Sequence, residues 1–235
     1  MNSDIAEERP VGEPVLAHPA KRPARAVLDG RTVRLVPLDA ELHADALFDA
    51  ANGPGKDQVW DYLFDAPGAD RAAFKAEIAA KAKSEDPLFF AIIDQRTGAA
   101  AGYQTLMRID AAHRVIEVGN ILYAPALQRT VGATEAQYLF MRHVFEDLGY
   151  RRFEWKCNAL NAPSRRAAER FGFTFEGVFR QHMIVKRRNR DTAWYAILDR
   201  DWPRQKEAFE RWLDPANFDA DGLQKSPLRA QAKAP

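Results

Sequence analysis

One stretch of the chain, from Glu117 to Phe173, constrains the fold more than any other part. It reads as a strand, a turn of small residues that opens a helix, a second strand, and a helix that Asn161 caps and Gly172 ends. A helix that starts beside a strand end presents free backbone N–H groups. These groups bind a diphosphate without needing a charged side chain for every oxygen. The sequence therefore predicts an anionic cofactor.

The hydrophobic pattern on either side of this stretch predicts further strands and helices. Alternating apolar and polar residues indicate strands, and apolar residues repeating every three or four positions indicate helices. Strands that alternate with helices and end in a hairpin are typical of an α/β protein, here with a mixed sheet covered by helices on both faces. The expected strands are 33–38, 88–94, 100–110, 116–124, 151–159, 175–188 and 191–199; the expected helices are 41–52, 70–83, 134–148, 162–171 and 206–213.

Length and composition favour one folded domain. The chain has 235 residues, of which 46% are hydrophobic, and this is enough for one sizeable core. Residues 1–25 are rich in Pro, Ala and charge, so we expect a flexible leader there. We expect the folded domain over 26–203, and a C-terminal helix with a disordered tail over 204–235.

Charge and cysteine content exclude several classes of protein. The formal net charge is +1, which gives no general attraction to nucleic acid or to an anionic membrane. The only cysteine, Cys157, excludes an intrachain disulfide and suits a reducing cytosol; we interpret it as a buried thiol rather than a nucleophile. No apolar run reaches the roughly 18 residues that a membrane span needs. The histidines lack the paired spacing of a metal site, so no metal is expected. The reduced cysteine and the lack of a membrane span lead us to expect a cytoplasmic location.

The motifs of the central stretch resemble those of the GNAT superfamily of acetyl-CoA-dependent N-acetyltransferases. Residues 117–119 match its E-(I/V)-G strand element, residues 128–136 match its cofactor loop, and Asn161, Ser164 and 170–173 match its N-x-x-S…GF element. Together, in this order, they form a specific signal. The resemblance covers about 27–202, and it is strongest to the branch similar to ribosomal-protein alanine N-terminal acetyltransferases. It implies that 26–203 is an N-acetyltransferase domain with a single twisted sheet, which splays between its fourth and fifth strands for the pantetheine arm.

The resemblance also implies how acetyl-CoA binds. A backbone N–H of the fourth strand would polarise the thioester carbonyl, and the loop before the helix would hold the diphosphate. Arg129 and Val131 stand where the family commonly has glycines, and Gly132 comes one position late, so an ordinary helix start is the alternative. The cofactor-binding residues expected on this basis are Asn120, Ile121, Leu122, Gln128, Arg129, Thr130, Val131, Gly132, Ala133, Thr134, Asn161 and Ser164.

Direct attack by an amine requires a base and a proton for the leaving thiolate. Glu117 matches a family position often held by the catalytic carboxylate, and partial burial would raise its pKa. The alternative is a structural ion pair with Arg108 or Arg114. Where many family members have a tyrosine that protonates the thiolate, this chain has Ala168. Ser164, Tyr123 or water are the remaining candidates.

The acceptor amine is not fixed by the sequence. It is a small molecule or a protein N-terminus, with nucleic acid present only as part of a ribosomal substrate. The aromatic loop at 60–64 either packs on the core or lines the entrance, and the predicted turn Arg187, Arg188 and Arg190 is either solvated or contacts an anionic ligand. A catalytically inert acyl-CoA-binding module is the second hypothesis, whereas a P-loop nucleotide enzyme is excluded because its motif is absent. A homodimer is considered.

Overall fold

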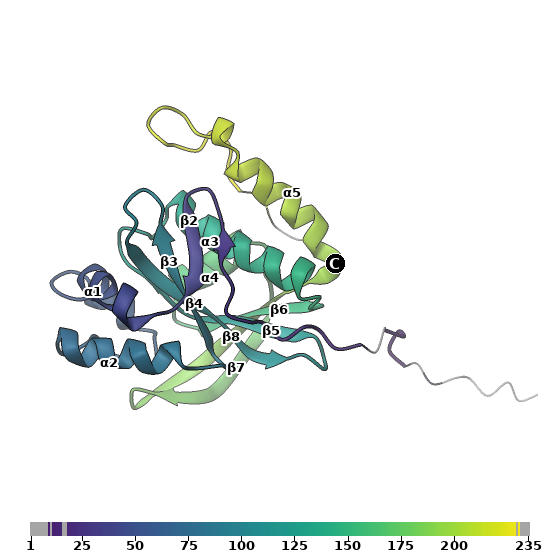
Figure 1. The fold of residues 1–235 in the computed structure, drawn as a ribbon. Coiled ribbons are helices and arrows are strands. Elements are labelled where there is room, and N and C mark those ends of the chain that lie inside the picture. Colours follow the sequence, from purple (N-terminus) through teal and green to yellow (C-terminus); the bar gives the residue numbers. More distant parts are fainter. Residues whose placement is uncertain (1–8, 10, 16–17, 229, 231–235) are drawn as a thin grey trace, which may run out of the picture.

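A computed structural model of the protein describes residues 9, 11–15, 18–228 and 230 (Figure 1). Its strands form one eight-stranded sheet in the order β1-β2-β3-β4-β5-β6-β8-β7. β5 and β6 pair in parallel and the other neighbours pair antiparallel, so the predicted mixed sheet is confirmed. The strands are β1 (Leu28–Asp29), β2 (Val33–Pro37), β3 (Leu88–Asp94), β4 (Ala100–Asp110), β5 (Val115–Tyr123), β6 (Arg152–Asn158), β7 (Thr174–Val185) and β8 (Arg188–Leu198).

Helices cover both faces of the sheet. α1 and α2 lie together on one face, over the half that contains β3 and β4, and enclose a core around Leu47, Phe74 and Tyr103. α3, α4 and α5 enclose a larger core on the opposite face, around Phe140 and Phe153. The helices are α1 (Ala40–Ala51), α2 (Arg71–Ala82), α3 (Val131–Arg142), α4 (Ala162–Arg170) and α5 (Trp202–Leu213). None of the described helices is long and apolar enough to cross a membrane.

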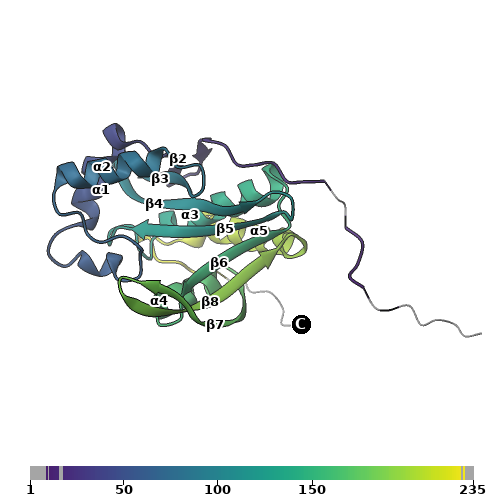
Figure 2. The ribbon, with the colours of Figure 1, turned by 90° about the horizontal axis from the view of Figure 1, so that it is seen from below.

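The two central strands separate, as the resemblance implied. β5 and β6 are paired only from Val118 and Trp155 back to the start of each strand, and beyond these residues they diverge (Figure 2). The ladder between β4 and β5 is also interrupted, because two residues of β5, Asn120 and Ile121, lie opposite one residue of β4. Asn120 has a φ of 45°, so this is a β-bulge at the point where the sheet opens.

The predicted leader is shorter than expected. The backbone N–H of Ala20 donates to Ala111 at 2.9 Å, that of Lys21 donates to Leu148 at 2.9 Å, and Ala20 is buried. Residues 18–25 therefore lie along the domain, held by backbone bonds that the proline-rich composition does not reveal. Of the remaining part of the predicted leader, 1–8, 10 and 16–17 lie outside the described residues.

The C-terminal segment belongs to the domain and is not an appended tail. α5 starts at Trp202, four residues before the predicted helix, and buries Trp202, Phe209 and Trp212 in the larger core. Leu228 and Ala230 are also buried. The predicted C-terminal helix is present, and charged residues on α5 hide its apolar face in the sequence. Residues 229 and 231–235 of the predicted tail lie outside the described residues.

Candidate active site

The loop before α3 keeps part of its hydrogen-bonding capacity free. α3 starts at Val131, three residues earlier than predicted, and Thr130 caps it by accepting from the N–H of Ala133 at 3.2 Å. The N–H of Thr130 donates to Leu127, and Thr134 lies within the first hydrogen-bonded turn of the helix. Among the described residues, no acceptor binds the N–H groups of Val131 and Gly132. These two amides are the free donors at the positive end of the helix dipole.

The two departures from the family's glycine pattern have structural explanations. Arg129 has a φ of 62°, the left-handed conformation in which glycine is favoured, so the loop adopts the expected shape with a strained arginine. Gly132 serves the packing, since a Cβ atom there would lie 2.8 Å from Cγ1 of Val33 on β2. Val131 is the first residue of α3 and has a negative φ, which agrees with a loop in which this residue still presents its N–H to a ligand.

Glu135, near the end of the cofactor-loop motif, has a structural role that the sequence did not reveal. Its buried carboxylate accepts hydrogen bonds from the backbone N–H groups of Arg31 at 2.7 Å, Thr32 at 2.6 Å and Val33 at 3.1 Å. The carboxylate therefore fixes the turn between β1 and β2 against the first turn of α3. Thr32 in this turn precedes Glu135 by 103 residues in the chain, so only the fold brings the two residues together.

The bulge of β5 leaves backbone groups outside the ladder at the point where the sheet opens. The pairing of Leu122 with Tyr103 resumes the ladder, which leaves Asn120 and Ile121 as the residues outside it. The side-chain hydroxyl of Thr105 donates to the carbonyl of Gly119 at 2.9 Å and holds the bulge in place. A bulge leaves a backbone N–H without a ladder partner, and such a group can donate to a carbonyl oxygen.

Glu117 lies on the same strand, buried and paired with two cations. Its Oε2 accepts from Nζ of Lys156 at 2.8 Å, with both side chains 5% exposed, and lies 3.3 Å from Nε of Arg108. Burial raises the pKa of Glu117 above its ordinary value, against the opposing effects of Lys156 and Arg108. Among the described residues, nothing donates a hydrogen bond to its Oε1. One oxygen of the carboxylate therefore forms the ion pair with Arg108 that the sequence analysis considered. The other oxygen, Oε1, is free to accept a proton.

Lys156 links this site to the neighbouring strand and was not recognised in the sequence. Its ammonium also binds Oε2 of Glu154 at 2.6 Å and lies 3.9 Å from the ring centroid of Trp194 on β8. The parallel register brings Glu117 beside Glu154, so one lysine on β6 serves both carboxylates. A polar residue at every second position of β6 was the available signal, but the partner depends on the strand order.

Tyr123 is held in a closed polar cluster. Its hydroxyl donates to Oε1 of Gln104 at 2.6 Å and accepts from Nε2 of Gln137 at 2.7 Å. Burial raises the pKa of Tyr123 far above its ordinary value, which makes the hydroxyl a weak acid. The geometry favours a packing role over proton donation. Gln128 also contacts this residue, through a hydrogen bond from its Nε2 to the Tyr123 carbonyl at 2.9 Å.

Ser164 and Asn161 lie at the start of α4, on the same face as α3. Asn161 accepts from the N–H of Ser164 at 3.1 Å, so its predicted role as a helix cap is confirmed. The hydroxyl oxygen of Ser164 accepts from Nε1 of Trp155 at 3.0 Å, and nearby Cys157 is buried, which raises the pKa of its thiol. Ala168 is completely buried.

The aromatic loop and the β7–β8 hairpin lie against each other. Trp60 is buried and its Nε1 donates to the carbonyl of Ala51 at 2.7 Å, so this part of the loop packs on the core, whereas Phe64 is 42% exposed. Lys186 reaches the carbonyl of Trp60 at 2.7 Å and joins the hairpin to this loop. No group of three or more His, Cys, Asp or Glu residues within the described part of the chain could hold a metal ion.

Comparisons with known proteins agree with this geometry. Residues 32–174 match the family described as acetyltransferase (GNAT) domain. The chain belongs to the GNAT acetyltransferase family. It is therefore a GNAT-type N-acetyltransferase, and its family implies acetyl transfer from acetyl-CoA.

Solved structures extend the similarity over most of the chain. A GCN5-related N-acetyltransferase from Brucella melitensis is 54% identical, with a TM-score of 0.88 over 90% of this chain and 96% of that one. A probable acetyltransferase of the GNAT family from Chromobacterium violaceum is 40% identical, with a TM-score of 0.76 over 83% of this chain and 99% of that one. The sheet and helix arrangement described above is thus that of the GNAT fold.

A curated relative carries a ribosomal name. "Putative ribosomal N-acetyltransferase YdaF" of Bacillus subtilis (strain 168) is 28% identical over 109 residues, which are 46% of this chain. The matched part spans 59% of the length of that relative. The resemblance to the ribosomal-protein branch, which the motifs indicated, is therefore confirmed.

Proposed function

We propose that this GNAT acetyltransferase transfers the acetyl group of acetyl-CoA to a primary amine by direct attack. The observation that carries the proposal is the pair of free N–H groups at Val131 and Gly132, which follow the β5 strand at the end where the sheet opens. These donors suit the diphosphate, and Arg129 adds positive charge beside them. The open strands leave a path for the pantetheine arm toward the bulge at Asn120 and Ile121.

In the proposed reaction the amine nitrogen forms a bond to the thioester carbon, the C–S bond breaks, and CoA leaves as a thiolate. The backbone N–H groups of the bulge stabilise the negative charge that develops on the carbonyl oxygen. Oε1 of Glu117 first takes a proton from the ammonium of the acceptor, directly or through water, and the neutral amine then attacks. Water or the Ser164 hydroxyl returns a proton to the thiolate.

Turnover of acetyl-CoA with a panel of amines, measured as free CoA thiol, tests this proposal. Calorimetric binding of acetyl-CoA together with amine-dependent thiol release supports it. Binding with no thiol release from any amine would instead support the inert acyl-CoA-binding module, and no heat at all would overturn both.

A protein N-terminus is the acceptor that the ribosomal name of YdaF supports, and a small amine is the alternative. In the first case nucleic acid is near only as part of the ribosomal substrate. A cytoplasmic location rests on the single reduced Cys157 and the ribosomal relative. A homodimer stays a prediction, which light scattering would test.

A further inference from the structure

Arg190 on β8 is a buried arginine that forms no ion pair within the part of the chain that the structure describes. Arg190 is 8% exposed, and its Nε forms no hydrogen bond. Among the described residues, no carboxylate forms an ion pair with it, and burial lowers the pKa of its guanidinium. A buried charge without a partner costs free energy, so natural proteins rarely keep one unless a ligand supplies the counter-charge.

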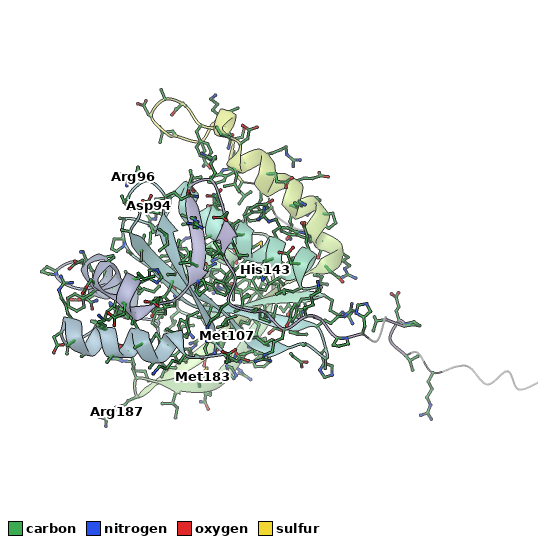
Figure 3. All side chains as sticks on the ribbon, viewed as in Figure 1. Asp94, Arg96, Met107, His143, Met183 and Arg187 are labelled. Atoms are coloured by element: carbon green, nitrogen blue, oxygen red, sulfur yellow. The ribbon has the colours of Figure 1, made fainter. Side chains whose placement is uncertain are left out.

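Arg190 lies on β8 and not in the turn, because the hairpin turns earlier than the sequence indicated. The turn is Lys186–Arg187, with φ values of 47° and 62°, so Arg190 is a strand residue rather than part of the predicted basic turn. Arg187 lies at the tip, where Figure 3 shows it pointing away from the sheet. Alternation along β8 then places Arg190 on the same face as Thr192 and Trp194.

That face is the one that carries Glu117 and Lys156. Lys156 covers the ring of Trp194, and Nδ1 of His182 lies 2.9 Å from Oγ1 of Thr192. The guanidinium of Arg190 lies 5.2 Å from the ring centroid of Phe64 in the aromatic loop. One face of the guanidinium is therefore against an aromatic ring, which leaves its in-plane N–H edge for an acceptor.

The balance of charge around Arg190 is positive. Lys156 forms ion pairs with Glu117 and Glu154, and Arg108 contacts Glu117, so both carboxylates are already paired with other cations. The charge of Glu117 raises the pKa of Arg190 against the effect of burial, but the two side chains form no ion pair. The pKa of His182 in the same region is lowered. Burial is the largest cause, and the positive charges of Arg108, Arg190 and Lys156 add to it. Nε1 of Trp194 is a second buried donor without a partner on this face.

We propose that Arg190 binds a carboxylate of the acceptor, so that the amine substrates of this enzyme carry an acidic group. This inference rests on the proposed function and defines its substrate class. A single guanidinium with an aromatic neighbour matches one planar monoanion, which it can bind through two parallel hydrogen bonds. The carboxylate belongs either to an acidic N-terminal residue of a peptide or to a free amino acid.

Matched pairs of acceptors test the proposal. The peptide Glu-Ala-Ala amide is compared with Gln-Ala-Ala amide, and free alanine is compared with alanine amide, by CoA thiol release. We expect the acid to exceed its neutral partner in kcat/KM by about 10- to 100-fold in at least one pair, as one charged hydrogen-bonding group contributes. The pair that shows the preference identifies the source of the carboxylate.

Arg190→Met should remove that preference while leaving the binding of acetyl-CoA, measured by calorimetry, unchanged. Arg187→Met, which removes an exposed arginine of the same hairpin, is the matched control and should keep it. Thermal unfolding of Arg190→Met should occur at the same or a higher temperature, because a buried unpaired charge is lost. Equal turnover of acid and neutral acceptors, or a preference that survives in Arg190→Met, would overturn the proposal but not acetyl transfer. Absence of acetyl-CoA binding and of turnover would overturn both.

Discussion

Glu117 is held between Lys156 and Arg108, and one of its carboxylate oxygens stays free for a proton. Replacing it by glutamine keeps the shape and removes the base. We expect Glu117→Gln to lower kcat by about 10²- to 10⁴-fold without changing the affinity for acetyl-CoA. Steady-state kinetics and calorimetry measure the two quantities. Glu154→Gln is the control on the same lysine: an equal fall there would show that charge balance, rather than the position of Glu117, sets the rate.

Lys156 lowers the pKa of Glu117 against the effect of burial, so its removal should raise that pKa further. In Lys156→Met the acid limb of the kcat profile should therefore shift to higher pH. A carboxyl whose folded-state pKa is raised loses stability as pH rises through that value. The variant should lose about 3 kcal/mol of unfolding free energy at neutral pH, and less in acid where Glu117 is protonated.

Urea unfolding at several pH values measures this dependence. Lys206→Met removes a half-exposed ion pair with Glu146 and should change the free energy of unfolding by less than about 1 kcal/mol at each pH. A Lys156→Met profile that overlays the wild-type profile would contradict the coupling between the lysine and the carboxylate.

At the scale of the element, the loop before α3 holds Arg129 in a left-handed backbone conformation that usually requires glycine. Arg129→Gly should raise the free energy of unfolding by up to about 1 kcal/mol, because glycine adopts a φ of 62° without steric cost. It should also raise the KM for acetyl-CoA two- to fivefold, roughly the contribution of one charge near a helix N-terminus. Arg114, on another turn, has a φ of 55°, so Arg114→Gly is the control. It should raise the free energy of unfolding by a similar amount and leave the KM for acetyl-CoA unchanged. A lower KM in Arg129→Gly would show that the charge does not contact the cofactor.

Local patterns predicted the elements well and the partners of their side chains poorly. The cap at Asn161 and the strand that contains Glu117 follow from nearby residues, whose propensities act over a few positions. Lys156 pairs with Glu117 only because β5 and β6 are parallel and in one register, which depends on the whole sheet. Arg190 was assigned to a turn because Lys186 and Arg187 are unusual in a two-residue turn that requires positive φ at both positions.

At the scale of the whole molecule, α5 packs against α3 and the end of α4 on the face of the sheet where the proposed cofactor residues lie. Phe209 is completely buried, with its ring centroid 5.8 Å from that of Tyr138 on α3 and 6.2 Å from that of Phe171 at the end of α4. Glu210 also accepts a hydrogen bond from the Tyr138 hydroxyl at 2.9 Å. The helix therefore supports the two elements that carry the proposed cofactor residues.

Phe209→Ala should lower the free energy of unfolding by about 3 to 5 kcal/mol, as expected when a buried aromatic ring leaves a cavity. A loss of this size is a large fraction of the stability of a typical domain, so the variant should unfold in one transition at much lower urea. Leu223→Ala, at a position 66% exposed beyond α5, is the control and should leave the transition in place. An unchanged midpoint in Phe209→Ala would mean that α5 is an independent appendage, and that the domain ends near residue 203 as the sequence had indicated.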